Sequence, residues 1–228
     1  MILKKWNELP EYMRNEAVRP YYDELEKKKC SLFCKRVFDI VCSFLMLLFL
    51  SPVFLFISIA IALDSPGEIF FRQERVTQYG KRFRIHKFRT MVANAEAKGS
   101  QVTVKNDMRF TKVGDKLRGC RLDELPQLID ILEGNMSYVG TRPEVPRYVD
   151  RYTDEMYATL LLPAGVTSEA SILYKDEERL LDGALNVDDT YVNEVLPGKM
   201  KYNLESLKSF TFLGELWTMI KTVFAVVR

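Results

Sequence analysis

Hydrophobic residues form one long uninterrupted run in the amino-terminal third of the chain. Residues 41–63, VCSFLMLLFLSPVFLFISIAIAL, include 23 positions without a charged side chain. At 1.5 Å per residue they would form about 35 Å of helix, close to the thickness of a bilayer core. The run starts too far along the chain, and is too long, for a cleaved secretory signal. We therefore expect a membrane helix that stays in the mature protein.

The charges on the two sides of this run have the same sign. Residues 65–121, after the run, carry 14 Lys and Arg against 5 Asp and Glu. The basic residues before it are Lys27, Lys28, Lys29, Lys35 and Arg36. The positive-inside rule therefore places both flanks in the cytoplasm.

A proline near the middle of the run would allow both flanks to lie on the cytoplasmic side. Pro52 lacks a backbone donor, so the helix should bend at Ser51-Pro52, and the Ser51 hydroxyl could satisfy part of the exposed backbone. A bent, re-entrant helix would enter and leave the same leaflet. A spanning helix that contains a proline is the alternative.

Shorter patterns predict the remaining elements. Residues 69–71 and 83–88 alternate around Tyr79-Gly80, which predicts two short strands in a hairpin. The pattern of residues 92–105 predicts a helix followed by an irregular segment. Apolar residues at helical spacing predict a helix over 122–132, with Gly134 as its stop signal.

The carboxyl-terminal stretch 210–227 has apolar residues at three- and four-residue spacing, which predicts an amphipathic helix. Its apolar face could pack on the domain core, or it could lie with Trp217 in the membrane interface. Both possibilities remain open from the sequence.

These patterns together predict an α/β protein that is mostly helical. Residues 1–34 are expected to form an amphipathic arm near the membrane surface, and residues 35–64 the membrane helix. Residues 65–228 would form a compact domain with short strands and amphipathic membrane-surface helices.

The amino-acid composition excludes several classes of protein and kinds of active site. The net charge of +2, with 47% hydrophobic and 28% charged residues, is ordinary for a globular protein and excludes a histone-like or disordered chain. Four cysteines lack the C-x-x-C spacing of zinc sites. His86 is the only histidine, so a His-rich metal site is excluded, and its basic neighbours favour a packing or surface role. We expect catalysis to depend on carboxylates.

Asp123-Glu124 is the candidate carboxylate pair. It stands at the start of the predicted 122–132 helix, with Pro126 in the first turn and Asp123 as the expected N-cap. Capping alone would explain an Asp-Glu pair at this position. A helix amino terminus also favours phosphate, and adjacent carboxylates can bind Mg²⁺ or attack phosphorus.

Basic residues on both sides of the pair suggest an anionic substrate. They are Lys87, Arg89, Lys112, Lys116, Arg118, Arg121 and Arg142. A nucleic acid is disfavoured because the chain has no recognised nucleic-acid motif and carries a membrane segment. Phosphate-loop and dinucleotide glycine motifs are also missing from the sequence.

Five motifs follow the Ser-Pro-bearing hydrophobic helix in a fixed order. They are Phe71-Arg-Gln-Glu-Arg-Val76, Lys87-Phe-Arg-Thr-Met91, Leu122-Asp-Glu-Leu-Pro-Gln-Leu128, Gly134-Asn-Met-Ser137 and Val139-Gly-Thr-Arg-Pro-Glu144. From about residue 35 to residue 228 the chain resembles the bacterial sugar transferases known as monotopic polyprenyl-phosphate phosphoglycosyl transferases. Each motif alone is modest, but the ordered set is specific.

The resemblance implies transfer of a phosphosugar from a UDP-sugar to undecaprenyl phosphate with release of UMP, as the first membrane step of glycan assembly. It implies that Asp123 is the nucleophile of a covalent intermediate, and that Asp123 and Glu124 serve an Mg²⁺ site. Lys87, Arg118 and Arg142 match positions linked to activity or phosphate binding, and Arg89 is a further candidate. The resemblance also implies a helix that re-enters the membrane at Ser51-Pro52.

The expected location is the bacterial inner membrane, with the catalytic domain facing the cytoplasm. Expected partners are the UDP-sugar, undecaprenyl phosphate and the bilayer, together with a homodimer mate and downstream glycosyltransferases, and no nucleic acid.

Two departures and two alternatives accompany this interpretation. Thr141 replaces a proline of the usual Gly-Pro-Arg-Pro loop, and residues 164–168 differ from the common Pro-Gly-Ile-Thr-Gly run. The sugar therefore cannot be assigned by analogy. One alternative is a single-displacement transferase in which Asp123 only binds the metal, and the other is an inactive membrane scaffold.

Overall fold

The computed structural model describes residues 3–92, 108–175, 177–180 and 186–227. The prediction for 92–105 lies, from residue 93 onward, outside the described residues. The elements in chain order are η1 (Trp6–Glu8), η2 (Glu11–Met13), α1 (Arg19–Glu26), α2 (Lys29–Asp64), β1 (Phe70–Val76), η3 (Gln78–Gly80), β2 (Arg82–Phe88), α3 (Lys112–Gly119), η5 (Leu122–Glu124), α4 (Gln127–Glu133), β3 (Met136–Val139), α5 (Pro146–Val149), η6 (Met156–Leu161), β4 (Ala164–Thr167), α6 (Glu169–Leu173), α7 (Glu177–Leu180), α8 (Val187–Thr190), η7 (Tyr191–Val195), α9 (Leu196–Lys208) and α10 (Phe212–Val227). The predicted α/β class with mostly helical content is confirmed.

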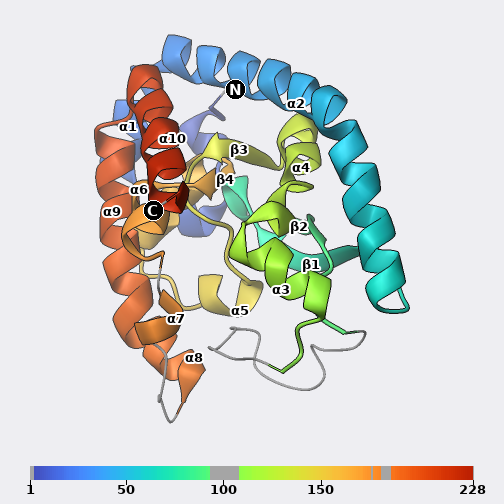
Figure 1. Cartoon of the computed structure of the whole chain (residues 1–228). Helices are drawn as coiled ribbons and strands as arrows, with labels where there is room; N and C mark the ends of the chain where they lie inside the picture. Colours follow the sequence, from blue (N-terminus) through green and yellow to red (C-terminus); the bar gives the residue numbers. More distant parts are fainter. Residues whose placement is uncertain (1–2, 93–107, 176, 181–185, 228) are drawn as a thin grey trace.

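The 36-residue helix α2 borders the rest of the fold on two sides and bends in its middle part (Figure 1). Pro52 lies inside the helix and cannot donate to the carbonyl of Leu48, four residues earlier. The hydroxyl of Ser51 donates to that same carbonyl at 2.8 Å. The Ser-Pro pair therefore permits a bend without leaving this carbonyl unsatisfied.

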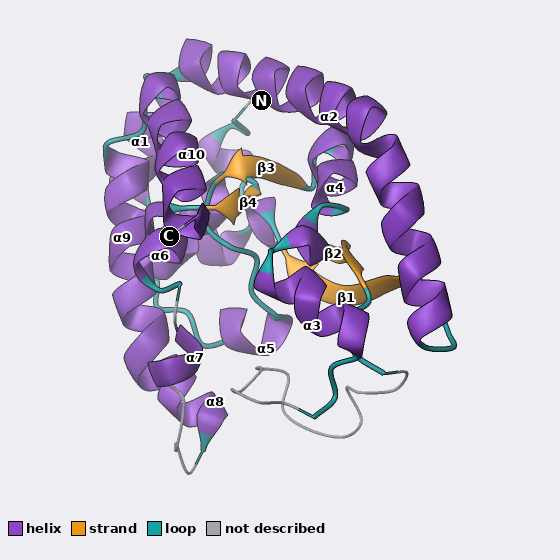
Figure 2. Cartoon of the chain, viewed as in Figure 1, coloured by secondary structure: helices purple, strands orange, loops and turns teal. Residues whose placement is uncertain are grey.

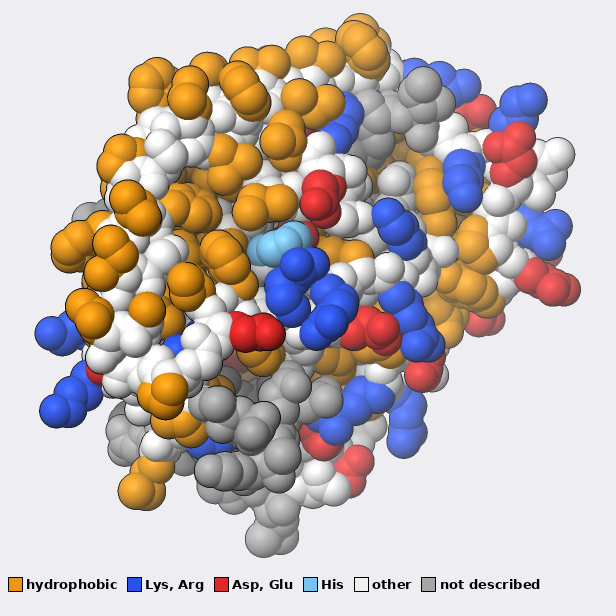
Figure 3. Space-filling view, turned by 90° about the vertical axis from the view of Figure 1, so that its right-hand side faces the viewer, with side chains coloured by type: hydrophobic (Ala, Val, Ile, Leu, Met, Phe, Trp, Pro, Cys, Tyr) orange, Lys and Arg blue, Asp and Glu red, His pale blue; other side chains and the backbone are white. Residues whose placement is uncertain are grey.

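The hydrophobic surface of α2 faces outward. By length and composition α2 could cross a membrane, and most of its apolar stretch is not buried inside the fold. Figure 3 shows hydrophobic side chains crowded over one part of the surface, beside a region rich in charged side chains. The most exposed large apolar residues of α2 are Phe33, Phe44, Leu48, Phe49, Leu55, Phe56, Ile59 and Leu63.

Two small sheets lie inside the bend of α2 (Figure 2). The predicted hairpin is confirmed: β1 and β2 pair antiparallel, with Phe70 opposite Phe88 and Val76 opposite Arg82. The second sheet consists of β3 and β4, which pair in parallel with Met136 opposite Ala164. The guanidinium of Arg36 on α2 donates to two carbonyls at the end of α4, which ties the long helix to the domain.

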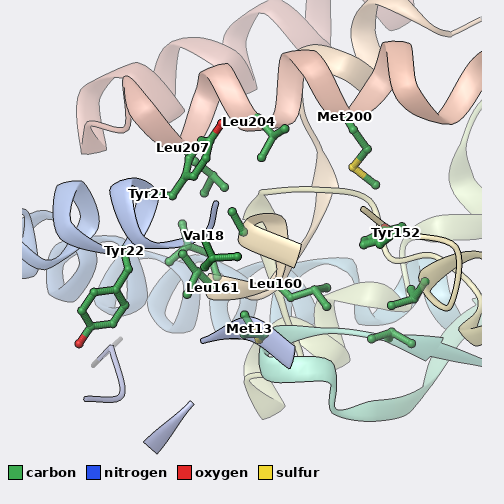
Figure 4. Packing of buried hydrophobic residues seen from close by; sticks show 14 of the residues in the cluster. Met13, Val18, Tyr21, Tyr22, Tyr152, Leu160, Leu161, Met200, Leu204 and Leu207 are labelled. Carbon is green, nitrogen blue, oxygen red and sulfur yellow. The ribbon is translucent and has the colours of Figure 1, made fainter. Parts of the chain in front are cut away.

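The largest hydrophobic core is built partly from the amino-terminal segment. Met13, Tyr21 and Leu25 are at most 2% exposed and pack with residues of η6 and α9 (Figure 4). Residues from the 3–26 segment thus form part of this core, and the position of this arm near the membrane surface stays a prediction. Helix α2 also starts at Lys29, before the expected residue 35.

Both helices predicted in the carboxyl-terminal half are present, and one of them needs adjustment. The helix predicted over 122–132 is divided into the 3₁₀ turn η5 and the short helix α4, so the N-cap of α4 is Pro126 and not Asp123. Gly134 ends α4 in a left-handed conformation, as predicted. The carboxyl-terminal helix is present as α10, and its apolar residues Leu213, Trp217 and Phe224 are exposed rather than packed on the core.

Candidate active site

Three elements distant in the sequence bring opposite charges together. Lys87 lies near the end of β2, Glu124 lies in η5, and Arg142 lies in the loop after β3. Lys87 Nζ donates to Glu124 Oε1 at 2.9 Å, and the guanidinium of Arg142 contacts both carboxylate oxygens of Glu124. Glu124 is therefore clamped between two cations.

The charges around Glu124 decide its ionisation. Burial would raise the pKa of Glu124, but Arg142 and Lys87 outweigh that effect and hold the pKa well below its ordinary value. Glu124 in turn raises the pKa of Arg142. Burial lowers the pKa of Lys87, and the charge of Glu124 opposes this shift. Glu124 thus remains an anion that orients two cationic side chains.

Asp123 has a different environment from its neighbour. Its side chain is buried, and its Oδ1 atom has no hydrogen-bond partner. Burial raises the pKa of Asp123, and the charges of Lys87, Arg118 and Arg142 oppose the rise. Arg121, just before the turn, has a left-handed backbone (φ 57°), a strained conformation for a non-glycine residue. A desolvated carboxylate with an unsatisfied oxygen is suited to attack or to metal binding.

Some of the predicted basic residues lie around the carboxylate pair, and another contacts a different part of the fold. Arg118, in the last turn of α3, lies 5.0 Å from the ring centroid of Phe110, and its charge acts on Asp123. The guanidinium of Arg89 instead donates to the carbonyls of Ser65 and Pro66, each at 2.7 Å. Arg89 thus contacts the end of α2, whereas Lys87, Arg118 and Arg142 surround the carboxylate pair.

Two supporting residues were missed by the sequence analysis. Arg75 donates to the carbonyl of Pro143 at 3.1 Å, which braces the loop that carries Arg142. Glu144 is buried and accepts a 2.5 Å hydrogen bond from Tyr191. Both lie within the recognised motifs, but a motif does not show which of its charged residues reaches the site and which supports the backbone.

The departures from the family pattern affect mainly the backbone around Arg142. The carbonyl of Thr141 accepts from the amide of Gly165 at 2.9 Å, a bond that does not depend on the Thr141 side chain. Ser168 caps α6 by accepting from the amide of Ser171. The carbonyl of Val166 accepts from Arg142 at 3.5 Å, so the 164–168 segment touches the cluster through its backbone.

A second group of titratable residues includes His86, the neighbour of Lys87 in the chain. Among the described residues, His86, Asp130 and Glu133 place ligand atoms within 4.8 Å of one another. His86 Nδ1 lies 2.8 Å from Asp130 Oδ1, and the amide of His86 donates to Asp130 Oδ2. These bonds join β2 to α4, which agrees with the packing role predicted for His86.

The sequence of nearly the whole chain matches one family. Residues 30–228 match the family described as "Bacterial sugar transferase". The chain belongs to this family. The geometry above is therefore that of a bacterial sugar transferase whose Asp-Glu pair is surrounded by Lys87, Arg118 and Arg142.

Curated relatives of this sugar transferase differ in the sugar that they are named for. The chain is 34% identical over 200 residues to the UDP-N-acetylgalactosamine-undecaprenyl-phosphate N-acetylgalactosaminephosphotransferase of Aeromonas hydrophila, covering 86% of the chain and 43% of that protein. It is 34% identical over 220 residues to the UDP-glucose:undecaprenyl-phosphate glucose-1-phosphate transferase of Escherichia coli K12, covering 95% and 44%. It is 40% identical over 192 residues to a Caulobacter vibrioides transferase of the same name, covering 83% and 68%. The chain spans less than half the length of the first two relatives.

Proposed function

We propose that this protein transfers a phosphosugar from a UDP-sugar to undecaprenyl phosphate and releases UMP. The main support is the cluster in which Asp123, with an unpartnered oxygen, lies next to a Glu124 held by Lys87 and Arg142. A substrate diphosphate is anionic and repels a carboxylate nucleophile. Cationic side chains next to the carboxylates reduce this repulsion. The reaction would begin a lipid-linked glycan, on which downstream glycosyltransferases then act.

The proposed reaction has two displacements. An Asp123 carboxylate oxygen attacks the phosphorus that carries the sugar, the bond from this phosphorus to the bridging oxygen breaks, and UMP leaves with that oxygen. A phosphate oxygen of undecaprenyl phosphate then attacks the same phosphorus, and the Asp123 carboxylate is released. The soluble nucleotide can thus depart before the lipid substrate binds.

Each basic residue has a separate role in this proposal. Arg142 and Lys87 exchange part of their contact with Glu124 for contact with the diphosphate, and Glu124 keeps both side chains aimed at the site. Arg118 adds positive charge on the side of Asp123. Arg75 maintains the backbone position of Pro143 next to Arg142.

Asp123 and Glu124 would also hold Mg²⁺. The buried Asp123 Oδ1 atom without a partner fits this role, because carboxylate oxygens are the ligands that Mg²⁺ prefers. The ion would supply further neutralisation of the diphosphate charge. EDTA should abolish turnover, and added Mg²⁺ should restore it.

For location, we propose the bacterial inner membrane with α2 re-entrant and the catalytic domain in the cytoplasm. The outward-facing apolar residues of α2, its bend and the exposed apolar residues of α10 support this placement. The site would then lie near the leaflet that contains undecaprenyl phosphate.

The first experiment is product analysis with purified protein in detergent, undecaprenyl phosphate, Mg²⁺ and a panel of UDP-sugars. Release of UMP is expected with at least one sugar, and that sugar identifies the donor. Release of UDP would show glycosyl transfer and overturn the proposal. No release of either nucleotide across the panel would favour an inactive scaffold.

A second experiment distinguishes the two-displacement mechanism from a single direct transfer. Labelled UMP should exchange into the UDP-sugar without undecaprenyl phosphate, because the first displacement is reversible and needs no lipid. Asp123→Asn should abolish the exchange, whereas Asp115→Asn, on the exposed surface of α3, should retain it. Exchange only in the presence of the lipid substrate would indicate direct transfer in a ternary complex.

A further inference from the structure

The inner face of the first half of α2 is polar, although its outer face is apolar. Lys35, Asp39 and Ser43 are each at most 2% exposed. The buried ammonium of Lys35 donates to the carbonyl of Val139 at 2.8 Å and to Glu215 Oε2 at 2.6 Å. A buried charge is tolerated only when it is paired and hydrogen-bonded, so these two contacts are the main reason that Lys35 can be buried.

The two partners of Lys35 belong to different parts of the fold. Val139 is the last residue of β3 and lies three positions before Arg142. Glu215 lies in the first turn of α10. Burial raises the pKa of Glu215 to about 7 even though Lys35 opposes the shift, so this pair is well removed from water. Lys35 thus links the membrane helix, the carboxyl-terminal helix and the strand that leads to Arg142.

The backbone before Arg142 is held firmly on one side. The amide of Gly140 donates to the carbonyl of Thr167 at 3.0 Å, and the amide of Gly165 donates to the carbonyl of Thr141 at 2.9 Å. A Cβ atom on Gly165 would lie only 2.2 Å from Gly140, so the two backbones are in close contact. Strand β4 therefore defines one side of this loop.

The side that faces α10 is less tightly packed. Val139, Gly140 and Thr141 line a cavity of about 240 Å³ that Glu215 also borders. Side-chain packing alone therefore does not fix the loop on this side. The hydrogen bond from Lys35 to the carbonyl of Val139 provides a directional constraint there.

We propose that Lys35 and Glu215 form a positioning pair for Arg142, an inference that rests on the proposed function in so far as Arg142 contacts the substrate. Lys35 holds the end of β3, and the Glu215 carboxyl gives the buried Lys35 side chain its second hydrogen-bond acceptor. The docking of α10 against α2 and the position of Arg142 are thereby coupled. Neither residue contacts the substrate.

The first test measures hydrogen exchange in the full-length protein with Lys35→Met and Glu215→Met combined. Replacing both members of a buried ion pair by apolar residues commonly preserves the fold, whereas a single replacement leaves one charge unpaired. The control is Lys28→Met, because Lys28 also donates to a backbone carbonyl, that of Lys208, but is only partly buried. Exchange is followed in peptides covering 138–145, 164–168 and α9.

We expect amide exchange in 138–145 and 164–168 to rise roughly tenfold in the double variant. Exchange in α9 and in the Lys28→Met control should remain at wild-type rates. Unchanged exchange in 138–145 would overturn the proposal. An equal rise in α9 would also overturn it, because it would show a general loss of stability rather than a local one.

The second test compares UMP release in two backgrounds. The Lys35→Met and Glu215→Met pair should reduce turnover by roughly 10- to 100-fold when Arg142 is present, because small displacements at a reacting centre are that costly. In an Arg142→Ala background it should cause no further loss, because residues that act through one another are non-additive. Additive losses would contradict the coupling. If wild-type protein releases no UMP, the proposed function fails, and the exchange experiment still decides the positioning role.

Discussion

Asp123 and Glu124 are neighbours in the chain but have opposite electrostatic environments. Glu124 is compensated by Lys87 and Arg142, whereas burial dominates at Asp123. The pKa of Asp123 is therefore raised and that of Glu124 is lowered. Such a separation between adjacent carboxyl groups is typical of a pair with two different roles.

The two carboxylates should have opposite effects on stability at pH 7. Because folding raises the pKa of Asp123, its ionised form destabilises the folded state at pH values above that raised pKa. Asp123→Asn should then raise the unfolding free energy by about 1 kcal/mol and the Tm by roughly 2–4 °C, while reducing turnover by on the order of 10³-fold or more. Thermal unfolding in detergent with EDTA present measures this effect without a contribution from bound metal.

Glu124→Gln should destabilise the same protein. The depressed pKa of Glu124 means that its stabilisation is fully present at pH 7 and is lost as the pH falls through the lowered pKa. Its removal takes the carboxylate partner from two partly buried cations, which costs about 3 kcal/mol. If both variants shift the Tm in the same direction, the opposite environments assigned to the two carboxylates are wrong.

Helix α2 combines a bend, an apolar outer surface and a polar inner face. A bend was predicted at Ser51-Pro52. Helix α2 bends in its middle part (Figure 1), and the Ser51 hydroxyl contacts the carbonyl that Pro52 leaves free. The polar inner face was not predicted, because Lys35 and Asp39 meet their partners only when α2 lies against β3 and α10. A hydrophobicity pattern describes the outer surface of such a helix better than its inner one.

Native cysteines allow a test of the helix topology. Cys30 lies before the apolar run and Cys120 after it, and both are exposed. In variants that retain only one of them, a membrane-impermeant maleimide should label both in inside-out vesicles and neither in intact spheroplasts. A spanning helix would instead expose one cysteine on each side. Pro52→Ala, which restores the backbone donor and favours a straight helix, should shift labelling toward the spanning pattern.

The apolar face of α10 is exposed. The fluorescence of the two tryptophans can show whether this face lies in the membrane interface. Trp217 is 57% exposed on this face, whereas Trp6 packs edge-on against Tyr22 with ring centroids 5.1 Å apart. Brominated phospholipids should quench the fluorescence of Trp217 in a Trp6→Phe protein, because an amphipathic helix buries its apolar face in the headgroup region. Trp6 in a Trp217→Phe protein serves as the control. Equal quenching of both would argue against interfacial placement of α10.

At the scale of the whole molecule, the amino-terminal segment contributes to the largest hydrophobic core. Leu25 has no exposed surface and belongs to the core cluster that includes α9 and η6. Leu25→Ala should lower the unfolding free energy by about 2–5 kcal/mol, because it leaves a cavity in that core. Leu213→Ala, at a 75% exposed position on α10, is the matched control and should leave the unfolding free energy nearly unchanged. Similar losses in both variants would contradict the core assignment.

Local patterns in the sequence determined the apolar helix with its proline, the hairpin and the Asp-Glu pair. Each of these depends on residues that are near one another in the chain, through helical periodicity, strand alternation or a backbone donor that proline lacks. The ordered motifs also indicated the family, which the comparison confirms.

Only the tertiary structure decided which charged residues meet. Lys87 and Arg142 lie 37 and 18 positions from Glu124 along the chain, and nothing local distinguishes them from Arg89, which contacts the end of α2. Likewise, the polar and apolar pattern of residues 1–34 did not show that this segment contributes to the core. These outcomes depend on contacts between distant elements, because desolvation and pairing of charges are set by whatever packs against them.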